Sequence, residues 1–183
     1  MKELQQNGYI MQRAESSAYR GVEGDNWYLN YLSINPYFKE FYEKNIEKEW
    51  LNPNFVECCA DAEYISRYVE ESNRLGIPYH ILLCSTDKPE PSLDATPEQE
   101  GTVLGYDCAY TGGSYYSCIV NDILSGRIQE FRGITLNENG LFATQEEAEA
   151  FMKYRDKLKK QTTEYVYEEG NFAIYKITEV IWR

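Results

Sequence analysis

The chain has 183 residues and a formal net charge of −12, from 30 acidic and 18 basic residues, and it contains one histidine. An acidic protein of this kind repels nucleic acid and anionic lipid and attracts basic partners, so we predict that it binds neither nucleic acid nor a membrane. The length suits one hydrophobic core, and the 43% apolar and 26% charged content is typical of a soluble protein. We therefore predict one globular domain over residues 1–183.

The cysteines and the N-terminal residues indicate in which cellular compartment the protein is expected. Residues 1–15 lack the apolar run of a signal peptide, and no stretch of about 18 apolar residues occurs anywhere. The five cysteines form no Cys-x-x-Cys pair and mostly have aliphatic neighbours, as buried thiols do. The sequence therefore predicts a reduced, cytoplasmic protein.

The first clear signal in chain order is a helix that begins at Asn35-Pro36. Before it, only residues 9–11 and 27–34 have strand character. Asn is a good N-cap and Pro suits the first helical position, while Asn52-Pro53 ends the predicted helix. Its apolar stripe is predicted to contain Phe38, Phe41, Tyr42, Ile46 and Trp50.

A second helix is predicted from about Val56 to Leu75, because Gly76 is a helix stop and Pro78 prevents continuation. The residues expected on its apolar face are Ala62, Ile65, Tyr68, Val69 and Leu75. Acid-first ion pairs at i,i+4 spacing are expected for Glu63 with Arg67 and for Glu70 with Arg74.

The middle of the chain is predicted to contain two strands, over residues 79–84 and 102–110. The consecutive apolar residues Ile81, Leu82 and Leu83 predict that the first of these strands is buried on both faces. Between the strands, residues 85–101 form an acidic, proline-containing loop, and loops of this length are usually functional or mobile.

A third helix is predicted from Ser114 to Gly126, and a turn is predicted at residues 137–140. A fourth helix has Thr144 as its N-cap, and Glu147 completes a capping box. Its buried stripe is predicted to contain Ala148, Phe151, Met152 and Leu158.

The last prediction along the chain is a C-terminal β-hairpin, with strands at 164–168 and 172–182 joined through residues 169–171. Taken together, the elements predict an α+β fold. It consists of one mixed β-sheet of about four to six strands with about four helices packed on it.

Any catalysis that depends on histidine must use His80, the only one. A nucleophilic triad would join it to Ser114 or Cys118 and to Asp107, but the residues around Ser114 do not form a Gly-x-Ser-x-Gly elbow. Asp107 falls within a predicted strand, where a buried carboxylate needs a partner. A small hydrolase or transferase with a cleft around His80, Asp107 and Gly112-Gly113-Ser114 is therefore kept as the alternative function.

No cofactor or metal site is predicted. The acids of the 85–101 loop lack the spacing of a calcium loop, and histidine and cysteine do not cluster as zinc ligands do. Gly112-Gly113-Ser114 lacks the ending of a P-loop, so a tight turn with Ser114 as N-cap is the simpler interpretation.

The leading prediction is an acidic protein-binding module. Residues 37–101 hold 14 acids and 6 bases, and acids alternate with aromatics in the first predicted helix. Small acidic domains of this character include bacterial immunity proteins, which neutralise basic, nuclease-type toxins by occluding the active groove. The contributing residues are predicted to be Glu40, Glu43, Glu47 and Trp50 in the helix and Asp87, Glu90, Asp94, Glu98 and Glu100 in the loop.

Overall fold

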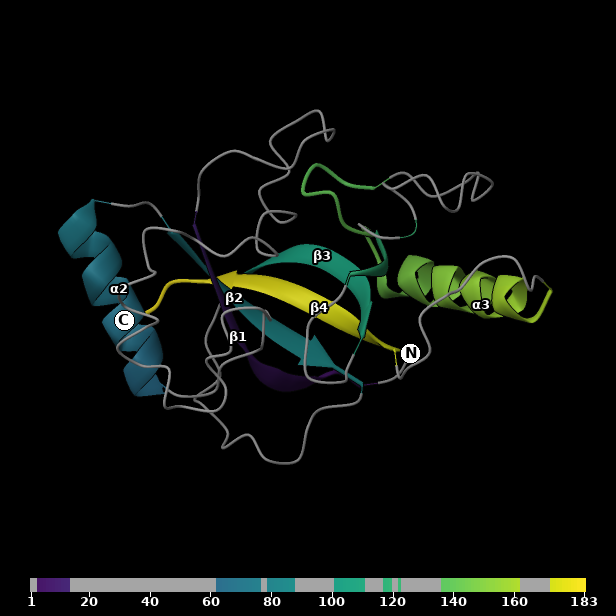
Figure 1. The fold of residues 1–183 in the computed structure, drawn as a ribbon, viewed down its shortest axis with the longest axis horizontal. Coiled ribbons are helices and arrows are strands. Elements are labelled where there is room, and N and C mark those ends of the chain that lie inside the picture. The colour runs from purple at the N-terminus through teal and green to yellow at the C-terminus, as the bar shows by residue number, and fades with distance from the viewer. Residues whose placement is uncertain are drawn as a thin grey trace.

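The computed structural model describes residues 3–13, 62–76, 79–87, 101–110, 117–119, 122, 136–161 and 172–183. In chain order these residues form β1 (Gln5–Arg13), α2 (Ala62–Leu75), β2 (Tyr79–Thr86), β3 (Gly101–Tyr110), α3 (Gln145–Gln161) and β4 (Phe172–Val180). The four strands make one sheet in the order β1-β2-β4-β3 (Figure 1). Of the helices among these residues, neither α2 nor α3 is long and apolar enough to cross a lipid bilayer.

The prediction of a mixed sheet is wrong, because every neighbouring pair of strands in this sheet is antiparallel. β2 and β3 do run in the same direction, but β4 lies between them and runs opposite to both. The sheet has four strands, and the part of the chain described here contains two helices, so the predicted set of about four helices on a mixed sheet is not what forms.

Two of the predicted helices cannot be compared in full. The helix expected at 35–52 lies outside the described residues. Of the helix expected from Ser114, only residues 117–119 and 122 are described: Ser117 pairs with Ala109 in an isolated bridge, and the other three have helical backbone.

The predicted C-terminal hairpin is corrected by the position of β4. β2 pairs with β4 from Tyr175 to Val180, and β3 pairs with β4 along its whole length. Both edges of β4 are therefore occupied from Tyr175 onward by strands distant in the sequence, not by a hairpin partner. Residues 164–168 themselves lie outside the described residues.

The sheet is buried on both faces by two separate apolar clusters. On β2, Ile81 and Leu83 pack in one cluster with Tyr9 and with Ile65 and Tyr68 of α2. The alternate β2 residues, Leu82 and Cys84, pack in the other cluster with Phe142 of the 136–144 segment and with Ala148 and Phe151 of α3. Figure 1 shows α2 beside one end of the strands and α3 beside the other. Burial of both faces of the strand at 79–84 is thus confirmed, and each such side chain contributes about 1.5–3 kcal/mol.

α2 ends where the sequence predicted. Gly76 has a φ of 64° and its N–H donates to the carbonyl of Asn73 over 3.2 Å. The Glu63–Arg67 ion pair forms, but Arg74 pairs with Glu71 at i,i+3 spacing in place of Glu70. Ala62 is exposed, so it does not belong to the buried face predicted for it.

α3 begins with the predicted capping box. Thr144 Oγ1 accepts the Glu147 N–H over 3.2 Å, and a Glu147 carboxylate oxygen accepts the Thr144 N–H over 3.2 Å. Before it, the predicted turn is confirmed: the Gly140 N–H donates to the Asn137 carbonyl over 2.9 Å, and Asn137 Nδ2 donates to the Leu104 carbonyl over 2.7 Å.

Candidate functional site

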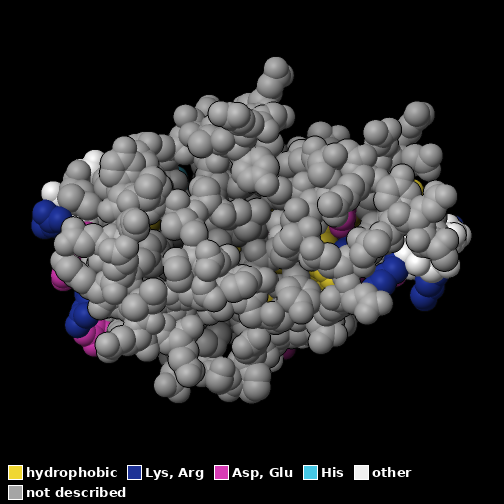
Figure 2. Space-filling view, in the orientation of Figure 1, with side chains coloured by type: hydrophobic (Ala, Val, Ile, Leu, Met, Phe, Trp, Pro, Cys, Tyr) yellow, Lys and Arg dark blue, Asp and Glu magenta, His cyan; other side chains and the backbone are white. Residues whose placement is uncertain are grey.

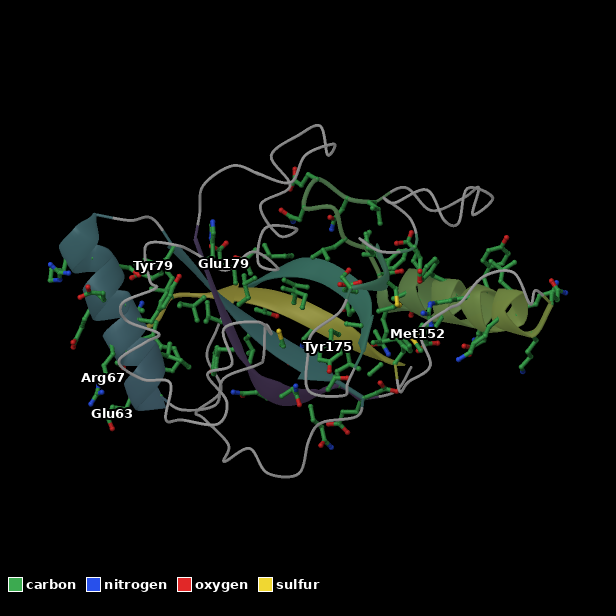
Figure 3. All side chains as sticks on the ribbon, in the orientation of Figure 1. Glu63, Arg67, Tyr79, Met152, Tyr175 and Glu179 are labelled. Carbon is green, nitrogen blue, oxygen red and sulfur yellow. The ribbon has the colours of Figure 1, made fainter. Side chains whose placement is uncertain are left out.

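A pocket of about 470 Å³ lies where β2 begins and β4 ends. This is the end of the sheet nearest α2, where Figure 3 labels Tyr79 and Glu179, whereas Tyr175 and Met152 are labelled at the end near α3. The residues that line the pocket are Tyr79, His80, Ile81, Gly101, Thr102, Glu179, Val180, Ile181 and Trp182.

The strand registers bring three polar side chains of the pocket onto one face of the sheet. Glu179 of β4 lies directly opposite Thr102 on β3 and opposite Leu82 on β2. His80 lies two residues before Leu82 and so points to the same face. His80 Nδ1 contacts a carboxylate oxygen of Glu179, which joins the two strands across the pocket.

Aromatic side chains support the pocket from the α2 side. The Trp182 Nε1–H donates to Ser66 Oγ over 3.0 Å, and the Trp182 ring packs edge-on against Tyr9 at 5.1 Å between centroids. Tyr79 packs edge-on against Tyr68 at 6.2 Å. These contacts hold the two rings in place, while Ile181, which directly follows β4 in the sequence, is 74% exposed.

The structure does not bring the candidate catalytic residues together. Asp107 lies opposite Tyr175, which lies opposite Thr86, six residues along β2 from His80. At the usual rise of a strand, His80 and Asp107 are therefore about 20 Å apart along the sheet. Ser114 lies outside the described residues, and Cys118 is buried.

Asp107 is fully buried, in keeping with its place in the predicted strand, and its Oδ1 accepts the Cys108 N–H over 2.6 Å. Nearby, under α3, Arg155 Nε donates to Asp122 Oδ2 over 2.7 Å, and the two side chains are buried, with exposed fractions of 5% and 4%. The Arg155 guanidinium also lies 4.0 Å from the centre of the Phe172 ring. A buried charge needs such partners, so this pair fixes α3 to the segment that carries Asp122.

Two thiols belong to the same buried region. Cys108 and Cys118 face each other next to the Ala109–Ser117 bridge, and both are buried. Burial raises the pKa of both thiols well above their usual value of 9.0. For Cys108, the neighbouring Cys118 adds to the increase in pKa. Thiols in this state are poor nucleophiles, so the region has a structural character and not that of a cysteine active site.

Most of the predicted partner-binding residues lie outside the described residues. Among them the structure describes only Asp87, which is partly exposed and whose Oδ1 accepts the Ile174 N–H over 3.4 Å. The other predicted contributors, which lie outside the described ranges, are Glu40, Glu43, Glu47, Trp50, Glu90, Asp94, Glu98 and Glu100.

The sequence interpretation missed Glu179, Trp182 and the Arg155–Asp122 pair. For Arg155 a signal was present, because it follows Phe151 by four residues and so falls on the buried stripe of α3, where a charge requires a partner. For Glu179 and Trp182 no local signal exists, because His80 and Glu179 are 99 residues apart and meet only through the β2–β4 pairing.

No protein-family model matches this chain, and no curated protein or solved structure matches it either.

Proposed function

We propose that this chain is a protein-binding module whose acidic surface occupies a basic partner, in the manner of an immunity protein bound to a nuclease-type toxin. The observation that carries the proposal is the charge distribution: of a net charge of −12, residues 37–101 contribute −8, from 14 acids and 6 bases. A field of this size attracts a basic protein, accelerates encounter and selects its orientation.

The charge is unevenly divided along the chain. The described residues hold 13 acids and 10 bases, a net charge of −3, so the remaining residues carry −9 of the total of −12. On α2, Arg67 and Arg74 neutralise Glu63 and Glu71, and Figure 2 shows blue and magenta side chains close together at that end of the molecule. The docking surface we propose consists of the acids of residues 37–50 and 85–101, two segments that together hold nine acids and four bases.

The mechanism we propose is occlusion. A nuclease binds the phosphates of its substrate with a positively charged groove, and carboxylates placed in that groove take the position of the phosphates. Tyrosine and tryptophan near those carboxylates would act as anchors, since buried aromatics carry much of the binding energy of interfaces. No catalytic step is required of this chain.

The test is capture of a partner from a lysate of the native host by the immobilised full chain, at about 50 mM and about 500 mM salt. We expect a basic protein to be retained at low salt and lost at high salt, because the Debye length falls from above 10 Å to a few ångströms. Reversal of Glu40, Glu43 and Glu47 to Lys should weaken retention at low salt by about tenfold or more.

The matched control reverses three exposed carboxylates elsewhere, Glu3, Glu70 and Glu138, which changes the net charge by the same amount. If the two triple variants lose the partner equally, net charge and not a defined surface explains the binding. If the captured protein is retained unchanged at high salt, the proposed function is wrong.

A further inference from the structure

We propose that Asn139 is a site of covalent modification, where deamidation converts the side-chain amide to a carboxylate once the turn at residues 137–142 separates from β3. The inference goes beyond the proposed docking surface and does not depend on it. Asn-Gly is the dipeptide in which this reaction is fastest, because glycine has no side chain to hinder its own backbone nitrogen. It occurs twice in the chain, at Asn7-Gly8 and Asn139-Gly140. Asn7 is buried within β1, whereas Asn139 lies in a turn and is partly exposed.

The reaction needs only water as a second reactant. The Gly140 backbone nitrogen bonds to Asn139 Cγ, the Cγ–Nδ2 bond breaks, and Nδ2 leaves as ammonia with the proton that the Gly140 nitrogen gives up. Water then opens the resulting cyclic imide at either of its carbonyl carbons, which leaves aspartate or isoaspartate at position 139. Deamidation therefore requires a Gly140 N–H that can be released and an Asn139 side chain that can turn toward it.

In the folded protein both reacting groups are held by hydrogen bonds. The Gly140 N–H donates to the Asn137 carbonyl over 2.9 Å. Asn139 Nδ2 donates to the Leu104 carbonyl of β3 over 3.1 Å, and the Asn139 N–H donates to Asn137 Oδ1 over 3.0 Å. Gly140 itself is buried. The closed turn thus engages the attacking nitrogen and holds the leaving amide against β3, so we expect the reaction to proceed through local opening of the turn.

Asn137 is the residue that holds the turn closed. Its Oδ1 accepts the N–H groups of Asn139 and Leu141 over 3.0 and 3.1 Å, and its Nδ2 donates to the Leu104 carbonyl over 2.7 Å. Backbone hydrogen bonds of Phe142 then fasten the end of the turn to β3. Since Leu141 and Phe142 are fully buried, opening of the turn exposes apolar surface, and the open state is a minor one.

Deamidation weakens the contact that restrains it. An ionised aspartate only accepts hydrogen bonds, so at position 139 it cannot donate to the Leu104 carbonyl, to which the amides of Asn137 and Asn139 both donate in the natural chain. An acceptor that faces a second acceptor also leaves both without a hydrogen bond. The modified turn is therefore expected to separate from β3 more often than the natural turn does.

The experiment incubates the full chain at neutral pH, in buffer and in urea, and measures the rate of deamidation at Asn139 by peptide mapping with mass spectrometry. For every variant, the rate in buffer is divided by the rate of the same variant in urea, which removes effects of the local sequence. We expect the natural chain to react at least about tenfold more slowly in buffer than in urea, because the closed turn exists only in the folded protein.

Two variants open the turn in different ways. Asn137→Ala removes the three hydrogen bonds of the Asn137 side chain. Gly105→Ala leaves the sequence of the turn unchanged, but its added Cβ lies 2.8 Å from Asn137 Nδ2 and displaces the turn from β3. Each should raise the relative rate at Asn139 by about tenfold or more.

The matched control is Ile65→Ala, which destabilises the protein without contact with the turn. Ile65 is fully buried in the cluster on the α2 side of the sheet, whereas Leu141 and Phe142 belong to the other cluster. Urea denaturation verifies that Ile65→Ala is folded and has lost at least as much stability as the turn variants. We expect it to leave the relative rate at Asn139 within about twofold of the natural rate, because local opening of the turn does not break contacts of Ile65.

The proposal is overturned if Asn139 does not deamidate in urea, or if it reacts as fast in buffer as in urea. It is also overturned if neither turn variant raises the relative rate. An increase in Ile65→Ala as large as that in the turn variants would show that Asn139 reacts only when the whole molecule unfolds, which also refutes the role of the turn. None of these outcomes bears on the capture of a basic partner, so the two proposals stand or fall separately.

Discussion

At the scale of single residues, one tight backbone constraint lies where β3 meets the turn at residues 137–142. Gly105 has a φ of 147°, in a region that glycine adopts far more readily than other residues. Phe142 accepts the Tyr106 N–H over 2.9 Å and donates to the Tyr106 carbonyl over 2.9 Å, so its backbone is fixed against the strand. The register of β3 with β4 shifts between Val103 and Gly105, which places the glycine at an irregularity in the ladder.

We expect Gly105→Ala to lower the free energy of unfolding by about 2 kcal/mol or more, from backbone strain and steric overlap together. A Cβ built at Gly105 lies 2.7 Å from both Leu141 Cβ and the Phe142 carbonyl oxygen. Urea denaturation followed by circular dichroism measures the loss. The matched control is Gly76→Ala, where φ is 64° but no heavy atom lies within 4 Å of the added Cβ, so only about 1 kcal/mol should be lost. Equal losses in the two variants would contradict the overlap.

At the scale of elements, the helix ends could be predicted from the sequence because each is decided by a few adjacent residues. The Thr144–Glu147 capping box and the Gly76 stop both depend on contacts within four positions of the chain. The pairing of strands, by contrast, does not depend on adjacent residues. β4 lies between β2 and β3, and those contacts join residues that are far apart in the sequence, so a terminal hairpin seemed the more economical pairing.

We expect Thr144→Ala to destabilise the protein by about 1 kcal/mol, because the Glu147 N–H loses its acceptor at the first turn of α3. Thr144→Ser keeps the hydroxyl and should lie within about 0.5 kcal/mol of the natural chain. Glu146→Gln, in the same turn but without a part in the box, is the control for the loss of a helix-terminal charge and should cost no more than about 0.5 kcal/mol. Chemical denaturation of the three variants provides the comparison, and a Thr144→Ala loss no greater than that of Glu146→Gln would argue against the cap.

At the scale of the whole molecule, composition revealed the charge excess but not the pocket at the end of the sheet. The pocket is assembled from residues 79–81, 101–102 and 179–182, which the antiparallel register collects at one end of the sheet. Patterns in a single sequence reveal the periodicity within one helix or strand. They do not show how the residues of one strand align with those of another. Asp107 illustrates the difference. Its position within a predicted strand indicates a buried side chain, whereas its distance from His80 depends on strand pairing and is seen only in the folded structure.

The two buried thiols, Cys108 and Cys118, also affect the whole molecule, because they make the folded protein less stable in alkali. In the unfolded chain the Cys108 and Cys118 thiols ionise near pH 9.0, whereas in the folded protein burial raises their pKa well above that value. As pH rises through about 9 the unfolded state therefore holds fewer protons than the folded state, and the free energy of unfolding falls. The stabilisation is complete below that pH, and its loss approaches about 1.4 kcal/mol per pH unit for each thiol.

We expect the natural chain to lose about 3 kcal/mol more stability between pH 8 and pH 10 than Cys108→Ala/Cys118→Ala loses. The double variant begins less stable, because the core loses two buried sulfurs, but that deficit does not depend on pH. Tyrosines, lysines and the remaining cysteines titrate alike in both proteins, so the difference between the two slopes isolates these thiols. Urea unfolding at half-unit pH steps measures both slopes, and parallel curves would show that Cys108 and Cys118 ionise in the folded protein as readily as in the unfolded chain.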